Sequence, residues 1–297
     1  MIKPHAVLAL VPLAVLRGRF AVRTWRRNRE LGSPITRSRI WNAFYIWCCF
    51  LRQSIPECRT RKRPAGPHRS MPDVIIPGPA GRIEGRYSPA KDPTAPIALI
   101  LHAHPKGGGH MEAPVNVMMY DEFKERGFSV LRFNFRGVGR SQGTYDQGLG
   151  ELSDAATALD WAQAHNPNAQ FCWVAGHSFG AWIAMQLLMR RPEIAGFVSV
   201  APPTNMYDFT FLAPCPASGL IVHGDADAIV PHDEMERAMS KVRTQKGITI
   251  STDIIPGAGH LFSTHVEPLQ ASMVKYLDKR IPEVIVERRE QPAGSRR

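Results

Sequence analysis

Neither a long hydrophobic run nor a cysteine framework is present in this sequence of 297 residues. Two apolar patches near its start, Ala6–Leu16 and Ile40–Leu51, fall short of the roughly 20 residues that span a bilayer. Of the five cysteines, only Cys172 and Cys215 lie beyond residue 70, and the chain has no CxxC motif. Scattered cysteines of this kind are typical of a reducing cytoplasm. We therefore expect a cytoplasmic protein without a disulfide scaffold or a cysteine zinc site.

Acidic residues are scarce in the first 70 positions, which hold 2 Glu, no Asp, 13 Arg and 2 Lys. The remaining 22 basic and 24 acidic residues give residues 71–297 a net charge of −2, although the whole chain carries +11. A nucleic-acid-binding protein needs a basic face on its folded body, and this body is nearly neutral. We therefore expect no nucleic-acid partner, and no membrane partner unless the basic leader is genuine.

Residues 1–70 form an Arg-rich leader that three interpretations fit. Patterned sequence begins abruptly with MPDVIIPGPAGRIEGRY at Met71, so we expect translation to start there. The alternatives are a targeting or membrane-surface segment and a disordered extension. After a domain over residues 71–282, the polar residues 283–297 predict a disordered tail.

Strand-like runs alternate with amphipathic segments throughout the predicted domain. Central runs such as Ile97–Ala103 and Gly219–Gly224 are nearly all apolar, as expected for parallel strands that are covered on both faces. The helical patterns cover residues 115–127, 150–167, 181–192, 233–245 and 265–280. This alternation predicts an α/β fold with a mostly parallel, eight-stranded sheet and helices on both faces.

The stretch VAGHSFGAW places a serine between two glycines where an apolar strand meets a helix. The pattern Gly-x-Ser-x-Gly is common by chance, but a sharp strand–turn–helix connection is the context in which it displays a nucleophile. Glycine at positions 176 and 180 would relieve crowding against the neighbouring strand and helix. Ser178 is therefore the candidate nucleophile.

Two later loops supply partners for this serine. HGDADAIVP holds Asp225 and Asp227, and PGAGHLF holds His260. Each loop follows a predicted strand, and open α/β sheets place their sites at the carboxyl ends of strands. The order Ser, Asp, His predicts a triad in which His260 takes the Ser178 proton and an aspartate orients the imidazole.

An oxyanion hole would complete this site with two backbone N–H groups. One should come from Phe179, the residue after the nucleophile, and the other from the glycine-rich loop HAHPKGGGHM. We predict the amide of Lys106 as this second donor, with that of Gly107 as the alternative.

These motifs together resemble the α/β-hydrolase family over residues 73–280. FNFRGVGRSQG is similar to the family's Arg-Gly-x-Gly-x-Ser turn. The HPxxGG and GxSFGAW motifs are similar to bacterial hydrolases related to the dienelactone-hydrolase and prolyl-peptidase-like branches. The family pattern Gly-x-x-Asp-x-x-Val-Pro implies Asp227 rather than Asp225 as the triad acid. Dienelactone chemistry is not implied, because that branch has cysteine at the position of Ser178.

Other polar residues have structural interpretations that we favour. Packing and loop hydrogen bonds account better than a metal for the histidines 102, 104 and 110, and a structural turn accounts better than an anion site for Arg136 and Arg140. We accordingly predict no metal and no organic cofactor.

The segment Pro202–Ser218 has 17 residues, too few for a helical lid domain. Its aromatic residues Tyr207, Phe209 and Phe211 could either wall the site or pack against the sheet. An open site favours a small soluble ester or acyl substrate, so we predict a serine esterase that forms an acyl-enzyme. The alternatives are a thioesterase, acyltransferase or peptidase with the same triad, and a non-catalytic binding protein. A homo-oligomer is compatible with the sequence.

Overall fold

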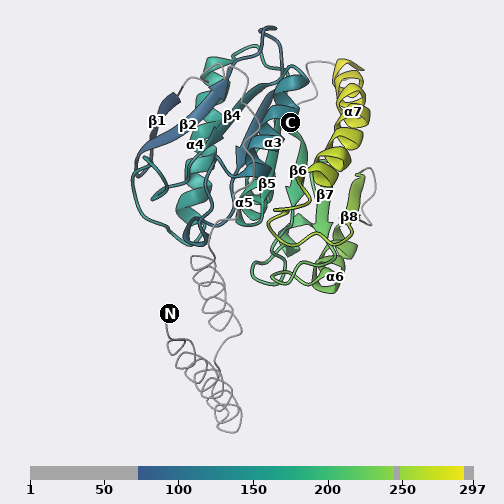
Figure 1. Ribbon diagram of the computed structural model, residues 1–297. Coiled ribbons are helices and arrows are strands. Elements are labelled where there is room, and N and C mark those ends of the chain that lie inside the picture. Colours follow the sequence, from purple (N-terminus) through teal and green to yellow (C-terminus); the bar gives the residue numbers. More distant parts are fainter. Residues whose placement is uncertain (1–72, 244–247, 291–297) are drawn as a thin grey trace, which may run out of the picture. The chain divides into compact units, whose positions relative to one another are not determined.

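Eight strands form a single sheet in the order β1-β2-β4-β3-β5-β6-β7-β8 (Figure 1). The computed structural model describes residues 73–243 and 248–290, so the leader (1–70) and the end of the predicted tail (291–297) lie outside the described residues. The strands are β1 Asp73–Gly78, β2 Gly81–Ser88, β3 Ile97–Leu101, β4 Ser129–Phe133, β5 Cys172–His177, β6 Ile194–Val200, β7 Gly219–Gly224 and β8 Ile250–Ile255.

Only the β1–β2 and β2–β4 pairs are antiparallel, and the five pairs from β4–β3 to β7–β8 are parallel. The predicted mostly parallel, eight-stranded sheet is therefore confirmed. Because every parallel strand runs the same way, the loops after β3, β5, β7 and β8 emerge at one edge of the sheet, where the candidate site residues lie.

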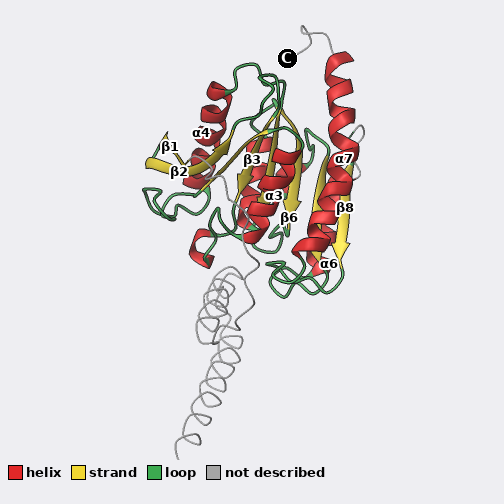
Figure 2. Cartoon of the chain, turned by 45° about the horizontal axis from the view of Figure 1, so that its top comes forward, coloured by secondary structure: helices red, strands yellow, loops and turns green. Residues whose placement is uncertain are grey.

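Helices cover both faces of the sheet, as predicted (Figure 2). They are α3 Pro114–Glu125, α4 Leu149–His165, α5 Phe179–Leu188, α6 His232–Arg243 and α7 Val266–Glu290. Side chains of α4, α5 and α6 share one apolar core, and those of α3 and α7 share the other. Strand β5 contributes to both cores by simple alternation, with Val174 in the first and Trp173 and Ala175 in the second. Among the described residues, no helix combines the length and hydropathy that a membrane crossing requires.

Helix α7 extends farther than the sequence predicts. It continues through Pro282 to Glu290, so the predicted domain boundary at residue 282 lies inside a helix, and residues 283–290 are helical instead of belonging to a disordered tail. The reason is packing beyond the proline, because Val284 is buried in the core of the α3 face. Arg280 also pairs with Glu287 across the proline, at 2.6 Å from Nη1 to Oε1.

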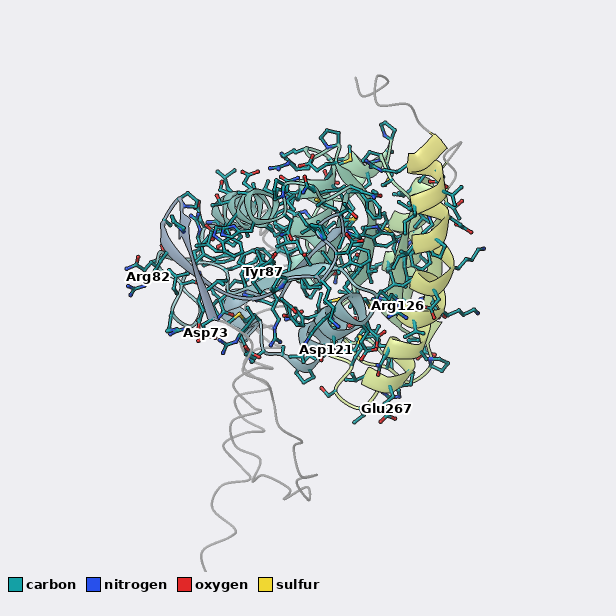
Figure 3. The ribbon with its side chains drawn as sticks, turned by 90° about the horizontal axis from the view of Figure 1, so that it is seen from above. Asp73, Arg82, Tyr87, Asp121, Arg126 and Glu267 are labelled. Atoms are coloured by element: carbon teal, nitrogen blue, oxygen red, sulfur yellow. The ribbon has the colours of Figure 1, made fainter. Side chains whose placement is uncertain are left out.

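An ion pair ties α7 to α3. Arg126, which follows the last residue of α3 and is labelled beside α7 in Figure 3, places Nη2 at 2.7 Å from Asp278 Oδ1. The same guanidinium donates to Glu122 at 2.6 Å, and Glu122 accepts a bond from Gln270 of α7. The face that carries the longest helix is thus fixed by polar contacts as well as by its apolar core.

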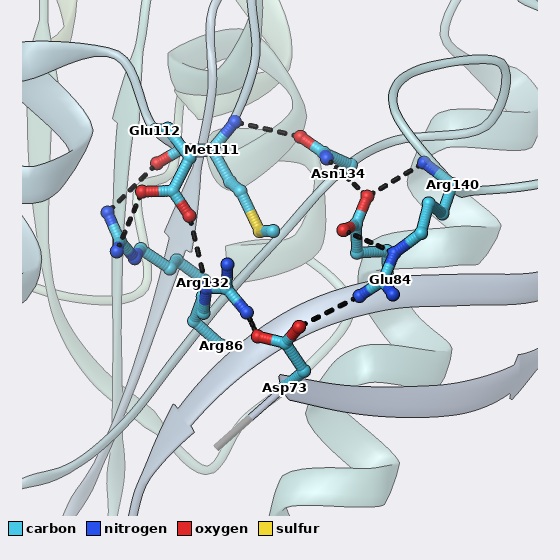
Figure 4. Close-up of polar contacts among 8 residues, drawn as sticks. All are labelled: Asp73, Glu84, Arg86, Met111, Glu112, Arg132, Asn134 and Arg140. Atoms are coloured by element: carbon cyan, nitrogen blue, oxygen red, sulfur yellow. Dashed lines mark hydrogen bonds and ion pairs between the residues drawn. The ribbon is translucent and has the colours of Figure 1, made fainter. Parts of the chain in front are cut away.

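The turn after β4 is anchored by buried polar contacts (Figure 4). Glu84 of β2 accepts bonds from the Arg140 amide at 2.7 Å, from Arg140 Nε at 2.9 Å and from Asn134 Nδ2 at 3.0 Å. Burial by itself raises the pKa of Glu84, but these bonds outweigh it and lower the pKa below the usual value. Arg136 makes a two-pronged pair with Asp154 of α4, at 2.9 and 2.7 Å. Both arginines therefore have the structural role that the sequence predicts.

Candidate active site

The connection from β5 to α5 is a strained turn with Ser178 at its centre. Ser178 has φ 54° and ψ −119°, a conformation that costs a non-glycine residue about 1–3 kcal/mol. A Cβ at Gly176 would lie 2.3 Å from the Gly180 carbonyl oxygen, and a Cβ at Gly180 would lie 2.4 Å from that of Leu101. Both glycines are thus required by close backbone approach, for the reason that the motif predicts.

The three predicted residues Ser178, His260 and Asp227 meet at the carboxyl edge of the sheet. His260 Nε2 lies 2.7 Å from Ser178 Oγ, and His260 Nδ1 lies 2.7 Å from Asp227 Oδ2. All three are buried, at 1%, 4% and 5% exposure respectively. The two contacts connect a serine hydroxyl, an imidazole and a carboxylate in series, the geometry in which a histidine can accept a serine proton.

Asp227 is held by its own loop between β7 and α6. Its Oδ1 accepts the amides of Ile229 at 2.8 Å and Val230 at 2.9 Å, which leaves Oδ2 for His260. Burial raises the pKa of Asp227, but the bond from His260 and these amides outweigh it and hold the pKa below the ordinary value. Asp225 is exposed and instead accepts the Gly257 amide at 2.6 Å. The structure therefore brings Asp227, and not Asp225, to the histidine.

The amide of Phe179 is well placed to be the first oxyanion donor. Phe179 is the first residue of α5, so its N–H has no acceptor within the helix and points from the positive end of the helix dipole.

The prediction of Lys106 as second donor is wrong. Its amide donates to His104 Nδ1 at 3.1 Å, and the alternative, the Gly107 amide, donates to the His104 carbonyl at 2.9 Å. The glycine-rich loop closes on itself, since a Cβ at Gly109 would lie 2.0 Å from the Ala103 carbonyl oxygen. These glycines therefore serve the closure of the loop around His104.

Aromatic rings surround Phe179 beside the nucleophile. Trp182 and Tyr207 stack with centroids 4.2 Å apart, and both lie within 6 Å of the Phe179 ring. Both are half-buried, as is Tyr145, whose hydroxyl lies 3.1 Å from His104 Nε2. Phe209 is buried in the core. Of the predicted wall residues, Tyr207 contacts the ring of Phe179, and Phe209 packs in the apolar core.

His102 has a structural role, because backbone groups occupy both of its ring nitrogens. Nδ1 lies 2.6 Å from the Ala103 carbonyl oxygen and Nε2 accepts the Phe135 amide at 3.0 Å. His110, in contrast, is exposed. Within the described residues, no group of His, Cys, Asp and Glu side chains is arranged to hold a metal ion.

Two fully buried histidines predict a loss of stability in mild acid. Burial lowers the pKa of His102 to about 3 and that of His177 to about 4. An unfolded histidine titrates near pH 6.5, so below that pH the unfolded chain binds two protons that the folded chain does not. Stability is then complete above about pH 6.5 and falls by about 2.7 kcal/mol per pH unit as the pH drops toward 4.

Urea unfolding at pH 7, 6 and 5 measures this slope, and His177→Gln should remove about half of it. An equal free energy of unfolding at pH 7 and pH 5 would contradict the assignment of neutral, buried histidines.

Comparison with known proteins identifies relatives of this chain. The family described as alpha/beta hydrolase fold matches residues 97–217. The uncharacterised protein RP471 of Rickettsia prowazekii is 50% identical over 211 residues, which cover 70% of this chain and 89% of that protein.

Two solved structures share the fold. One is ATU1826 of Agrobacterium tumefaciens, described as a candidate α/β hydrolase, with 56% identity, a TM-score of 0.71 and coverage of 71% of this chain and 97% of that one. The other is XC6422 of Xanthomonas campestris, an α/β serine hydrolase without a lid, with 27% identity, a TM-score of 0.64 and coverage of 73% and 98%.

Proposed function

Because this chain belongs to the α/β-hydrolase family, we propose that it is a serine hydrolase that cleaves small carboxylic esters. The observation that carries the proposal is the continuous series Ser178–His260–Asp227, with two contacts of 2.7 Å. A serine hydroxyl is a weak nucleophile until a positioned base accepts its proton, and this series supplies that base.

In the proposed mechanism, Ser178 Oγ attacks the ester carbonyl carbon while its proton passes to His260 Nε2. Asp227 stabilises the resulting imidazolium through Nδ1–H. When the tetrahedral intermediate collapses, the ester bond breaks and His260 returns the proton to the leaving alkoxide. Water then attacks the acyl-enzyme with His260 again as base, and the free acid and Ser178 are released. Side chains perform each proton transfer, so the mechanism requires no cofactor.

The oxyanion is assigned to the Phe179 amide and to a second donor in the segment Ala103–His104. This segment directly follows His102, whose carbonyl oxygen would lie 2.5 Å from a Cβ at Gly180 in the first turn of α5. Removing one such donor typically lowers turnover by about 10²–10³-fold.

The substrate class follows from the architecture around the serine. The segment between β6 and β7 holds only the short 3-10 helix Thr210–Leu212, so no lid domain covers the site in the described residues. The half-buried rings of Tyr207 and Trp182 suit an apolar group of a small, soluble ester. We assign the reaction to the cytoplasm, with the ester as its small-molecule partner.

A fluorophosphonate probe on the full chain tests this proposal. Wild-type protein should form a covalent adduct, and mass spectrometry should locate it on Ser178. Ser178→Ala should remove the labelling, whereas Ser199→Ala, which changes a buried serine of β6, should not. A panel of short p-nitrophenyl esters and thioesters then separates esterase from thioesterase activity. Folded wild-type protein that takes no label would overturn the proposal and favour a binding protein.

A further inference from the structure

His260 is held at two of its atoms by two consecutive residues of the chain. Ser178 bonds its imidazole, and the preceding residue, His177, places Nε2 at 2.9 Å from the His260 carbonyl oxygen. His177 is the last residue of β5 and is 2% exposed. The end of one central strand therefore carries the nucleophile and also anchors the backbone of the base.

The direction of this second contact follows from chemistry. A carbonyl oxygen only accepts, so His177 Nε2 must carry the proton and donate it. Nδ1 then holds a lone pair, and this atom is buried with no hydrogen-bond partner among the described residues. A leucine or methionine would fill such a site without burying a polar atom. What the histidine adds is one N–H, which donates to the His260 carbonyl.

The loop that His177 anchors holds one residue in a strained conformation. Phe262, two residues after His260, has φ 49°. A non-glycine residue such as Phe262 avoids this region unless its surroundings enforce it. The Phe262 ring is buried and lies 6.5 Å from the His177 ring. The bond from His177 to the His260 carbonyl is the polar contact that holds this loop against β5.

A second buried histidine, His223, anchors the loop that carries Asp227, as His177 anchors the loop that carries His260. His223, on β7, places Nε2 at 2.9 Å from the Val230 carbonyl oxygen, while the Val230 amide donates to Asp227. Its Nδ1 is also buried without a partner among the described residues. Both loops that bring a functional side chain to Ser178 are thus fixed by a buried imidazole at a strand end.

We propose that His177 is a positioning residue, which holds the His260 imidazole in line with Ser178 through the His260 backbone carbonyl. The inference rests on the proposed hydrolase function. His177 forms no bond to substrate and transfers no proton. The titratable groups that face it are His260, from the loop after β8, Asp227, from the loop after β7, and His102, directly after β3. Its contribution is geometric and should appear in turnover and in the hydrogen bond from His260 to Asp227, with little effect on substrate affinity.

The test compares His177→Leu with His177→Gln in the full chain. Leucine removes the donor and keeps an apolar filling, whereas glutamine keeps an N–H donor at the same number of bonds from the backbone. We expect His177→Leu to lower kcat by about 10–100-fold with KM changed less than about twofold, as for loss of an interaction that acts in the transition state. His177→Gln should recover at least half of the logarithmic loss.

A readout that does not depend on substrate accompanies the kinetics. The proton of His260 Nδ1–H, bonded to Asp227, should give a low-field ¹H NMR resonance that is retained in His177→Gln and is lost or broadened in His177→Leu. A general loss of stability would not remove this resonance under conditions in which the variant is still folded.

Equal kcat in the wild type and His177→Leu, or equal losses in the two variants, would overturn the inference. If the wild type itself fails to label with the fluorophosphonate, the proposed function fails instead. The resonance of His260 still tests the positioning role in that case.

Discussion

A His260→Ala variant is expected to hydrolyse p-nitrophenyl acetate with a kcat about 10⁶-fold below that of the wild type, because nothing else in the site accepts the Ser178 proton. The fold should persist, since alanine removes one buried ring. Asp227→Ala should cost less, about 10⁴-fold, because the histidine remains but loses its orientation and the stabilisation of its cation. Steady-state kinetics with active-site titration measures both losses.

Neighbouring residues provide matched controls for these losses. His265 lies on the same loop as His260, and Asp225 lies two residues before Asp227, but neither touches Ser178 or the His260 ring in the structure. Replacing either one by alanine should change kcat by less than about tenfold, since only loop contacts are affected. A His260→Ala variant with activity within tenfold of the wild type would remove His260 from the mechanism.

Gly180→Ala should strongly destabilise the fold, although it adds only one methyl group. The new Cβ would lie 2.4 and 2.5 Å from the carbonyl oxygens of Leu101 and His102, which are backbone atoms that cannot rotate away. Helix α5 would have to move away from β3. We expect a loss on the order of 4 kcal/mol in the free energy of unfolding, which is much of the typical stability of a domain.

Urea unfolding and the rate of fluorophosphonate labelling measure this change, and labelling should slow because the Phe179 amide moves with the helix. Gly108→Ala is the control. Gly108 has φ 80° but nothing within 4 Å of the added Cβ, so only backbone strain of about 1 kcal/mol is expected. Equal stabilities of the two variants would show that the approach of α5 to β3 does not require glycine.

The sequence predicts those parts of the fold that depend on local pattern. The central strands were recognisable from apolar runs, because a parallel strand covered on both faces has almost no polar positions. The turn at Ser178 was recognisable for a different reason. A serine between two glycines at a strand–helix junction indicates that the backbone passes too closely for side chains at the glycine positions. The distances at Gly176 and Gly180 confirm this close approach. Position in the fold then brought Asp227 and His260 to Ser178.

The features that the sequence did not predict depend on the hydrogen-bond partners of individual polar atoms. Lys106 was chosen as an oxyanion donor from its place in the loop, but the imidazole of His104 accepts that amide. Spacing along the chain does not reveal that a side chain two residues away accepts this amide. Similarly, the predicted helical pattern ended at residue 280, and the contact of Arg280 with Glu287 beyond that point depends on side chains two turns apart. The signal for His177 and His223 was present, since each is a polar residue in the last two positions of a buried apolar strand.

The placement of β8 has a consequence for how this protein would lose activity. Within the described residues β8 is the last strand of the sheet, pairs only with β7 and has mostly half-buried residues, whereas β5 is central and fully buried. His260 follows β8, and Ser178 follows β5. Sheet edges open in local fluctuations that cost less than global unfolding. For the proposed hydrolase we therefore expect inactivation to begin with the separation of His260 from Ser178, and amide hydrogen exchange in β8 to follow the loss of activity more closely than the melting temperature does.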